Sequence, residues 1–448
     1  MKVRRRHAPC TFCALLALAL ATSGCVQSAE VNRLALIDLM ALDAAPDGQV
    51  RVTAQVIMPT RLGVGPASAA GEGAPFFLVE STGRTVAEAV SNLQKKVPRQ
   101  VFLEHMQLLV IGDELARRGL FPVIDFLVRD QEIRTDLLVA VTPGTGAELL
   151  NIASPLPAVP GEAWNDLIRH ERLVVSSVRN LFVALGEEGQ EPFLTAVAPS
   201  SVQEPGGGSP LGDMELIGAG VMRGDRLAGY LDRDEAIGLQ LLLDDRPRSV
   251  VSVTAQAVLA QMGGAAAARV RGGEDEGEDD PGGSGGAGDP TIGGETRGHQ
   301  PVHPWDYTSL RLRRVNTSLS PVSAEPPTLR FEARLVLDIV NTASLLDVEN
   351  PDVAAALERA LADLFESYVR AAVSKMQAMN ADAAGFGAVF RRSRPHWWRA
   401  MRERWPELFP QAQVLYDIEV AVVRTGLATR PVGPEAHLEL PGRGVTTR

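Results

Sequence analysis

Cysteine is the residue that this chain most clearly lacks. Only three occur among 448 residues, Cys10, Cys13 and Cys25, so none follows position 25. From Val26 onward no internal disulfide can form, although a compartment outside the membrane would often permit one. The stability of this part must therefore come from packing, and it has no thiol to act as a nucleophile.

Positive charge and long apolar runs are also scarce. The chain has 44 Lys and Arg against 55 Asp and Glu, a formal net charge of -11. This balance argues against nucleic acid as a partner, because nucleic-acid binding needs a basic face. After residue 25 no apolar run reaches the roughly 20 residues of a transmembrane helix. We therefore expect any contact with a membrane to be made through a lipid group.

The first 24 residues have the composition of a secretory signal peptide. Lys2 and Arg4–Arg6 are basic, residues 14–21 are only Ala and Leu, and small residues precede Cys25. This order resembles a bacterial lipobox, in which the Cys takes a diacylglycerol and becomes the first mature residue. Lipoboxes usually carry Leu three residues before the Cys, and this chain has Thr22 at that position. We predict lipidation at Cys25 and membrane attachment through acyl chains; the alternative is an ordinary signal peptide with a chance cysteine.

Strand and helix patterns alternate along the first half of the remaining chain. Residues 34–42 and 50–56 predict a β-hairpin around Asp47-Gly48, and Thr85 begins a helix with a capping box. Further patterns predict strands at 102–111, 137–141 and 193–198, two helices between Asp113 and residue 129, and a helix at 163–185. We expect an α+β fold of two to three mixed domains. Its predicted parts are 26–200 (N-terminal domain), 212–260 (hairpin, helix and a strand at 250–259), 261–303 (insert), 305–427 (C-terminal domain) and 428–448 (disordered tail).

The insert differs in composition from the rest of the chain. It is rich in Gly and holds six acidic residues between Glu274 and Asp280, so we expect it to be disordered. A calcium loop is the alternative, but it would place its ligands at alternate positions around a fixed Gly. We therefore predict no metal site.

The C-terminal domain contains the clearest helix pattern, after strands expected at 309–315 and 329–340. Asn350-Pro351 starts a helix whose apolar stripe extends from Leu357 to Met376. Gly385-Phe386-Gly387 predicts a corner between helices. Trp397, Trp398 and Trp405 follow, as part of a core or, alternatively, as a ligand cage or membrane belt; a strand is expected at 414–423.

No catalytic constellation is evident. On the predicted strand, Glu104 and His105 would point to opposite faces, and His170-Glu171 lacks the second His of a zinc helix. His303 and His396 are isolated. We predict no catalytic and no cofactor-binding residues. The charged residues from Arg129 to Arg134 would form a solvated turn or the polar rim of a partner contact.

The order of several motifs resembles the Ger(x)C family, the lipoprotein C-subunits of spore germinant receptors. The matching runs are Leu34-Ala35 and Asp43, Val56-Ile57-Met58-Pro59, Gly83-Arg84-Thr85, Glu88-Ala89, Pro98-Arg99, Phe102-Leu103 and His105, Glu114-Leu115-Ala116, Arg129-Asp130, Glu132-Ile133-Arg134, Gly218-Ala219-Gly220-Val221, Leu227 to Leu231, Ala381-Asp382, Gly385-Phe386-Gly387, Trp397, Trp405, Phe409-Pro410 and Arg424-Thr425-Gly426. Glu104 departs from the family's Gly before the His.

The resemblance implies a non-enzymatic receptor subunit. It would lie on the extracytoplasmic face of the spore inner membrane, anchored at Cys25 beside a membrane-embedded A-subunit and a transporter-like B-subunit. The leading alternative is a solute-binding lipoprotein, which would have a deep cleft with convergent polar groups between two domains. An envelope hydrolase is a third hypothesis, which the missing nucleophile and metal motifs argue against.

Overall fold

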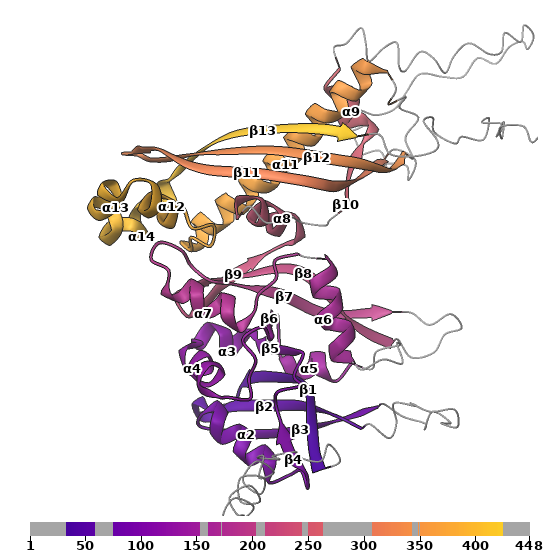
Figure 1. Ribbon diagram of the computed structural model, residues 1–448, viewed down its shortest axis with the longest axis vertical. Coiled ribbons are helices and arrows are strands. Elements are labelled where there is room, and N and C mark those ends of the chain that lie inside the picture. The colour runs from indigo at the N-terminus through magenta and orange to yellow at the C-terminus, as the bar shows by residue number, and fades with distance from the viewer. Residues whose placement is uncertain are drawn as a thin grey trace, which may run out of the picture.

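The computed structural model describes residues 33–58, 75–152, 160–171, 173–202, 211–243, 250–262, 307–342, 348 and 350–423. Two β-sheets with helices packed on them form an elongated molecule, the first sheet below and the second above in Figure 1. The α+β class is confirmed. The predicted signal peptide, Cys25, the acidic run of the insert and the tail lie outside the described residues.

The first sheet has the order β3-β2-β1-β5-β6-β7-β8-β9, with β4 beside β1. Its centre, β1-β5-β6-β7, is parallel and its flanking pairs are antiparallel. Every residue of β5 and β6 is buried, as expected for parallel strands covered on both faces. The strands are β1 (Leu34–Ala44), β2 (Val50–Ile57), β3 (Phe76–Gly83), β4 (Gln100–Phe102), β5 (Leu108–Gly112), β6 (Leu138–Thr142), β7 (Phe193–Val202), β8 (Leu211–Arg223) and β9 (Arg226–Leu231).

Helices cover both faces of this sheet. Alternate residues of β1, β5 and β6 belong to two separate apolar cores, one shared with α5 and α6 and the other with α2, α3, α4 and α7. The Thr85 hydroxyl accepts a hydrogen bond from the Glu88 N–H, so the predicted cap is confirmed. The helices are α2 (Val86–Gln94), α3 (Asp113–Arg118), α4 (Phe121–Arg129), α5 (Gly146–Leu150), α6 (Pro160–Glu171) and α7 (Val178–Gly186).

Three predicted elements are each divided. The helix expected over 163–185 is two helices, because Ser177 forms a bridge with Leu138 and its hydroxyl caps α7. The strand expected over 102–111 is broken by a turn in which the Met106 N–H donates to the Leu103 carbonyl. The strand expected over 250–259 ends at Thr254, whose hydroxyl accepts from the Ala257 N–H and begins a helix.

The second sheet has the order β10-β11-β12-β13 and carries the long helix α11 on one face. Asn350 caps α11 as predicted, accepting from the Asp352 N–H. β13 is parallel to β12 along its whole length. The elements are β10 (Val250–Thr254), α9 (Ala255–Ala260), β11 (Tyr307–Ala324), β12 (Pro327–Thr342), α11 (Pro351–Met379), α12 (Phe386–Ser393), α13 (Pro395–Met401), α14 (Trp405–Leu408) and β13 (Gln413–Val423).

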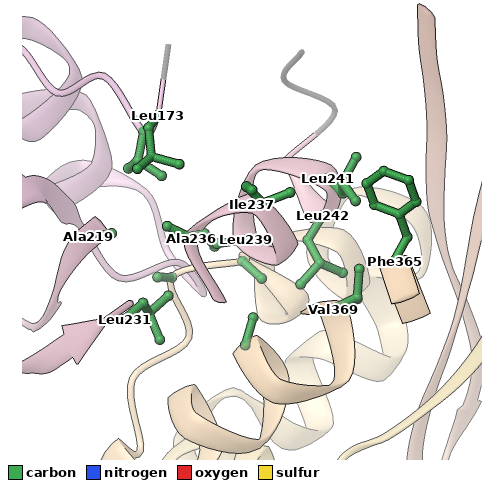
Figure 2. Close-up of a cluster of buried hydrophobic side chains, with 14 of the residues drawn as sticks. Leu173, Ala219, Leu231, Ala236, Ile237, Leu239, Leu241, Leu242, Phe365 and Val369 are labelled. Carbon is green, nitrogen blue, oxygen red and sulfur yellow. The ribbon is translucent and has the colours of Figure 1, made fainter. Parts of the chain in front are cut away.

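Helix α8 (Arg233–Leu242) joins the two halves (Figures 1 and 2). Its residues 236–242 are all buried, and Gly238 brings α8 into backbone contact with Tyr368 of α11. The segment expected as a separate middle domain is thus divided: the β8–β9 hairpin completes the first sheet, β10 joins the second, and α8 lies between them. The physical reason is that α8 is apolar on nearly all sides and needs two partners to be buried.

Candidate functional site

The predicted lipidation residue, Cys25, lies outside the described residues, nine positions before β1 begins. Within the described ranges, no helix is long and apolar enough to cross a membrane. The same ranges contain no cluster of three or more His, Cys, Asp and Glu side chains that could hold a metal ion.

The histidines considered from the sequence are placed separately. Glu104 and His105 lie in the turn between β4 and β5 rather than on a strand, so the expectation of opposite strand faces was wrong. Nδ1 of His170 is 2.7 Å from the Asp166 carbonyl oxygen, which ties this ring to its own helix. His396 stacks edge-on against Trp397 with 5.7 Å between ring centroids, and His303 lies outside the described residues.

The charged segment after α4 is occupied by its own contacts. Arg129 pairs with Asp125, and Arg134 pairs with Asp136. A carboxylate oxygen of Glu132 accepts the Leu103 N–H at 3.1 Å, which fixes the turn before β5. These contacts favour the solvated-turn interpretation over a polar rim.

A polar depression of about 220 Å³ lies beside the turn that precedes β5. The Asn165 amide donates to the Gln107 carbonyl, and Arg169 donates both to the Asn165 side chain and to the Asp136 carbonyl. The polar groups here thus bond mainly to one another. The depression is lined by Met106, Gln107, Arg134, Asp136, Leu137, Asn165 and Arg169.

The junction between the two sheets is apolar. Figure 2 shows Leu241 and Leu242 of α8 beside Phe365 and Val369 of α11. A solute-binding lipoprotein would need convergent polar groups in such a place. The junction is instead packed as a core.

Two of the C-terminal tryptophans belong to the same apolar core as the junction. Trp398 and Trp405 are buried and meet edge-to-face at 5.6 Å, and Phe390 lies 5.8 Å from Trp405. The core interpretation of these two side chains is confirmed. Gly385 has φ +73°, which an L side chain rarely adopts, as expected for the Gly385-Phe386-Gly387 corner.

Two buried aspartates, to which the sequence assigned no site role, each hold the start of a helix. Asp382 accepts the N–H groups of Phe386 and Gly387, both at 2.8 Å, and burial raises its pKa to about 7. Asp38 on β1 accepts the Gly161 N–H at 2.7 Å, and burial raises its pKa to about 7 as well. Each carboxyl fixes the start of a helix, so these groups are structural.

One surface has the character of a partner contact. Phe121 and Val128 of α4 and Phe182 and Val183 of α7 are 60%, 48%, 55% and 60% exposed, and the two helices contact each other. We call these four residues the α4–α7 surface. Sequence reasoning missed it; the available indication was that α7 carries apolar residues on more than the one stripe that contains Val178 and Leu181.

Comparison with known proteins gives a consistent result over most of the chain. The "Spore germination protein N-terminal domain" matches residues 27–199, and the "Spore germination B3/ GerAC like, C-terminal" domain matches residues 297–426. Spore germination protein KC of Bacillus subtilis (strain 168) is 23% identical, over 91% of this chain and 94% of its own length. Spore germination protein B3 of the same organism is 21% identical, over 93% of this chain and 97% of its own length.

A crystal structure of the GerBC protein covers 86% of this chain and 96% of its own, at 19% identity and a TM-score of 0.49. The two domain matches together span more than half of the sequence and occur in the order that the motifs indicated. The chain belongs to the Ger(x)C family of spore germination proteins.

Proposed function

We propose that this protein is the lipid-anchored, non-enzymatic C-subunit of a spore germinant receptor, needed for receptor assembly and function in nutrient-triggered germination. Acyl chains on Cys25 would hold it on the extracytoplasmic face of the spore inner membrane, beside the A- and B-subunits. Family membership and the names of the relatives support this role.

The α4–α7 surface is the observation that carries the assembly role. Exposed large apolar residues that are grouped on neighbouring elements can mark contact sites. Two of the four side chains are phenylalanines, and aromatic residues are enriched in protein interfaces. Since α4 and α7 contact each other on one face of the first sheet, a partner could cover all four residues at once.

The test is recovery of partners from spore membranes. The tagged full-length protein is purified with mild detergent, and the co-purifying proteins are identified by mass spectrometry. Wild type should recover multi-pass subunits, and Phe121→Glu/Phe182→Glu should recover them at least about tenfold less, as expected when two interface aromatics are lost. Leu415→Glu is the matched control, because Leu415 is exposed on β13 of the other sheet.

Two outcomes would contradict the proposal. Wild-type protein recovered without any multi-pass partner would refute the receptor role. Unchanged recovery with Phe121→Glu/Phe182→Glu would refute the assignment of the α4–α7 surface alone. Both variants must keep the wild-type urea midpoint, which separates lost contact from lost folding.

A further inference from the structure

The start of β1 lies in a basic part of the surface. Leu34 pairs with Gln100 of β4 in parallel register, and Arg33 and Arg99 directly precede these two residues, just before the adjacent strands begin. Both arginines are exposed. β4 and α2 are at the lower end of the long axis in Figure 1.

Two lysines extend this basic group. Lys95 and Lys96 follow α2 directly and are exposed. The ammonium group of Lys95 donates to the Asn92 side chain at 2.9 Å, and that of Lys96 donates to the Glu80 carbonyl at 2.6 Å. Both bonds are to neutral groups, so neither ammonium group donates a hydrogen bond to a carboxylate in them.

The use of lysine here is unusual for this chain. It has four lysines in all, and of the three that follow Cys25, two are Lys95 and Lys96. Lysine carries a compact, mobile charge on a flexible stem, whereas arginine favours fixed bidentate pairs. The third, Lys375, lies 2.6 Å from a carboxylate oxygen of Glu235.

Few acids oppose this group. Glu80 on β3 is exposed nearby, and Glu88 of α2 is paired with Arg84 and also interacts electrostatically with Lys95. Lys95, Lys96 and Arg99, which we call the basic end, together with Arg84 therefore carry four positive charges against the two negative charges of Glu80 and Glu88. The chain as a whole has a net charge of -11.

We propose that the basic end contacts the headgroups of anionic phospholipids. Cys25 precedes Arg33 by eight residues, which span at most about 28 Å when fully extended. A lipid on Cys25 would thus hold the basic end near the membrane surface, where a basic cluster adds a second, electrostatic attachment to the acyl chains. The inference rests on the proposed anchorage.

Lysine acetylation tests this contact directly. The full chain, produced in a lipidating host, is reconstituted on vesicles of phosphatidylcholine with or without phosphatidylglycerol, and acetylation is followed by mass spectrometry. Lys95 and Lys96 should react at least about threefold more slowly on the anionic vesicles, and the difference should disappear at about 1 M salt, where screening acts within a few ångströms. Lys375 should react equally on both.

Charge reversal provides the second measurement. The Cys25→Ala chain should still sediment with anionic vesicles at low salt. Adding Lys95→Glu/Lys96→Glu/Arg99→Glu to that chain should abolish this sedimentation. Arg311→Glu/Arg314→Glu/Arg330→Glu changes the net charge equally, at exposed positions on β11 and β12, and should leave the sedimentation unchanged.

The two proposals fail in different ways. Equal acetylation on neutral and anionic vesicles would overturn the contact of the basic end and leave the anchorage intact. Loss of the wild-type chain from all vesicles would contradict the anchorage. In that case, sedimentation of the Cys25→Ala chain with anionic vesicles would still test whether the basic end contacts lipid.

Discussion

The indole Nε1–H of Trp405 donates a hydrogen bond to Oδ2 of Asp382, 3.1 Å away in the buried part of the C-terminal corner. The same carboxyl accepts the N–H groups of Phe386 and Gly387. One side chain therefore holds the start of α12 and the start of α14 together, although they are far apart in sequence.

Removing this carboxyl should destabilise the corner strongly. Asp382→Ala leaves three buried donors without an acceptor, and we expect a loss of at least about 3 kcal/mol in the free energy of unfolding. Urea unfolding followed by tryptophan fluorescence measures it. Asp417→Ala on the exposed face of β13 is the control and should change stability by less than about 0.5 kcal/mol. A similar small change for Asp382→Ala would contradict the assigned role.

The raised pKa of Asp38 predicts a pH dependence of stability. Its pKa is about 7 in the folded protein, against about 3.9 when unfolded, so the folded state binds the additional proton between these values. This contribution is greatest below pH 4 and is lost as the pH rises through 7. Between pH 5 and 7 the wild type should lose up to about 2 kcal/mol relative to Asp38→Asn, measured by urea unfolding at each pH. Parallel pH curves for the two proteins would refute the raised pKa.

Gly238 should not tolerate a side chain. A Cβ at this position would lie 2.3 Å from the Tyr368 carbonyl oxygen, so α8 and α11 would have to move apart. Although Ala favours a helix by about 1 kcal/mol, overpacking costs more, and we expect Gly238→Ala to destabilise by about 1–2 kcal/mol. Gly186→Ala at the end of α7, where a Cβ meets nothing within 4 Å, is the control in the same thermal melts. Equal melting temperatures for the two variants would rule out a tight junction.

Replacement of Cys25 tests the proposed anchor. Cys25→Ala should move the protein from the membrane to the soluble fraction of broken spores and slow nutrient-triggered germination, because the acyl chains are lost. Thr22→Leu, which restores the usual lipobox residue, should instead raise the lipidated fraction seen by intact-mass spectrometry. Unchanged membrane retention and germination in Cys25→Ala would remove the anchor from the proposal.

The sequence predicted best where local chemistry decides the structure. The caps at Thr85 and Asn350 depend on neighbouring residues alone, and the positive φ at Gly385 follows from the residue type. β3 was missed because its buried positions do not alternate regularly. The break after α6 was missed because it depends on the bridge between Ser177 and Leu138, a contact between distant residues.

The candidate site was harder to predict for the same reason. Whether Phe182 is exposed or buried depends on which face of α7 meets the sheet, and both faces carry apolar residues. The importance of Asp382 follows from its burial beside Trp405, which the sequence does not state. Family motifs located the region of this corner but not the hydrogen bonds that make it necessary.

The packing of helix α8 determines how the two sheets can move relative to each other. Because its leucines belong to one continuous apolar core that extends from β1 to Phe409, close packing joins the two halves over the described residues. Close-packed interiors resist compression. A displacement of the α4–α7 surface by a partner would therefore move the second sheet as part of one rigid body, rather than be absorbed by a hinge.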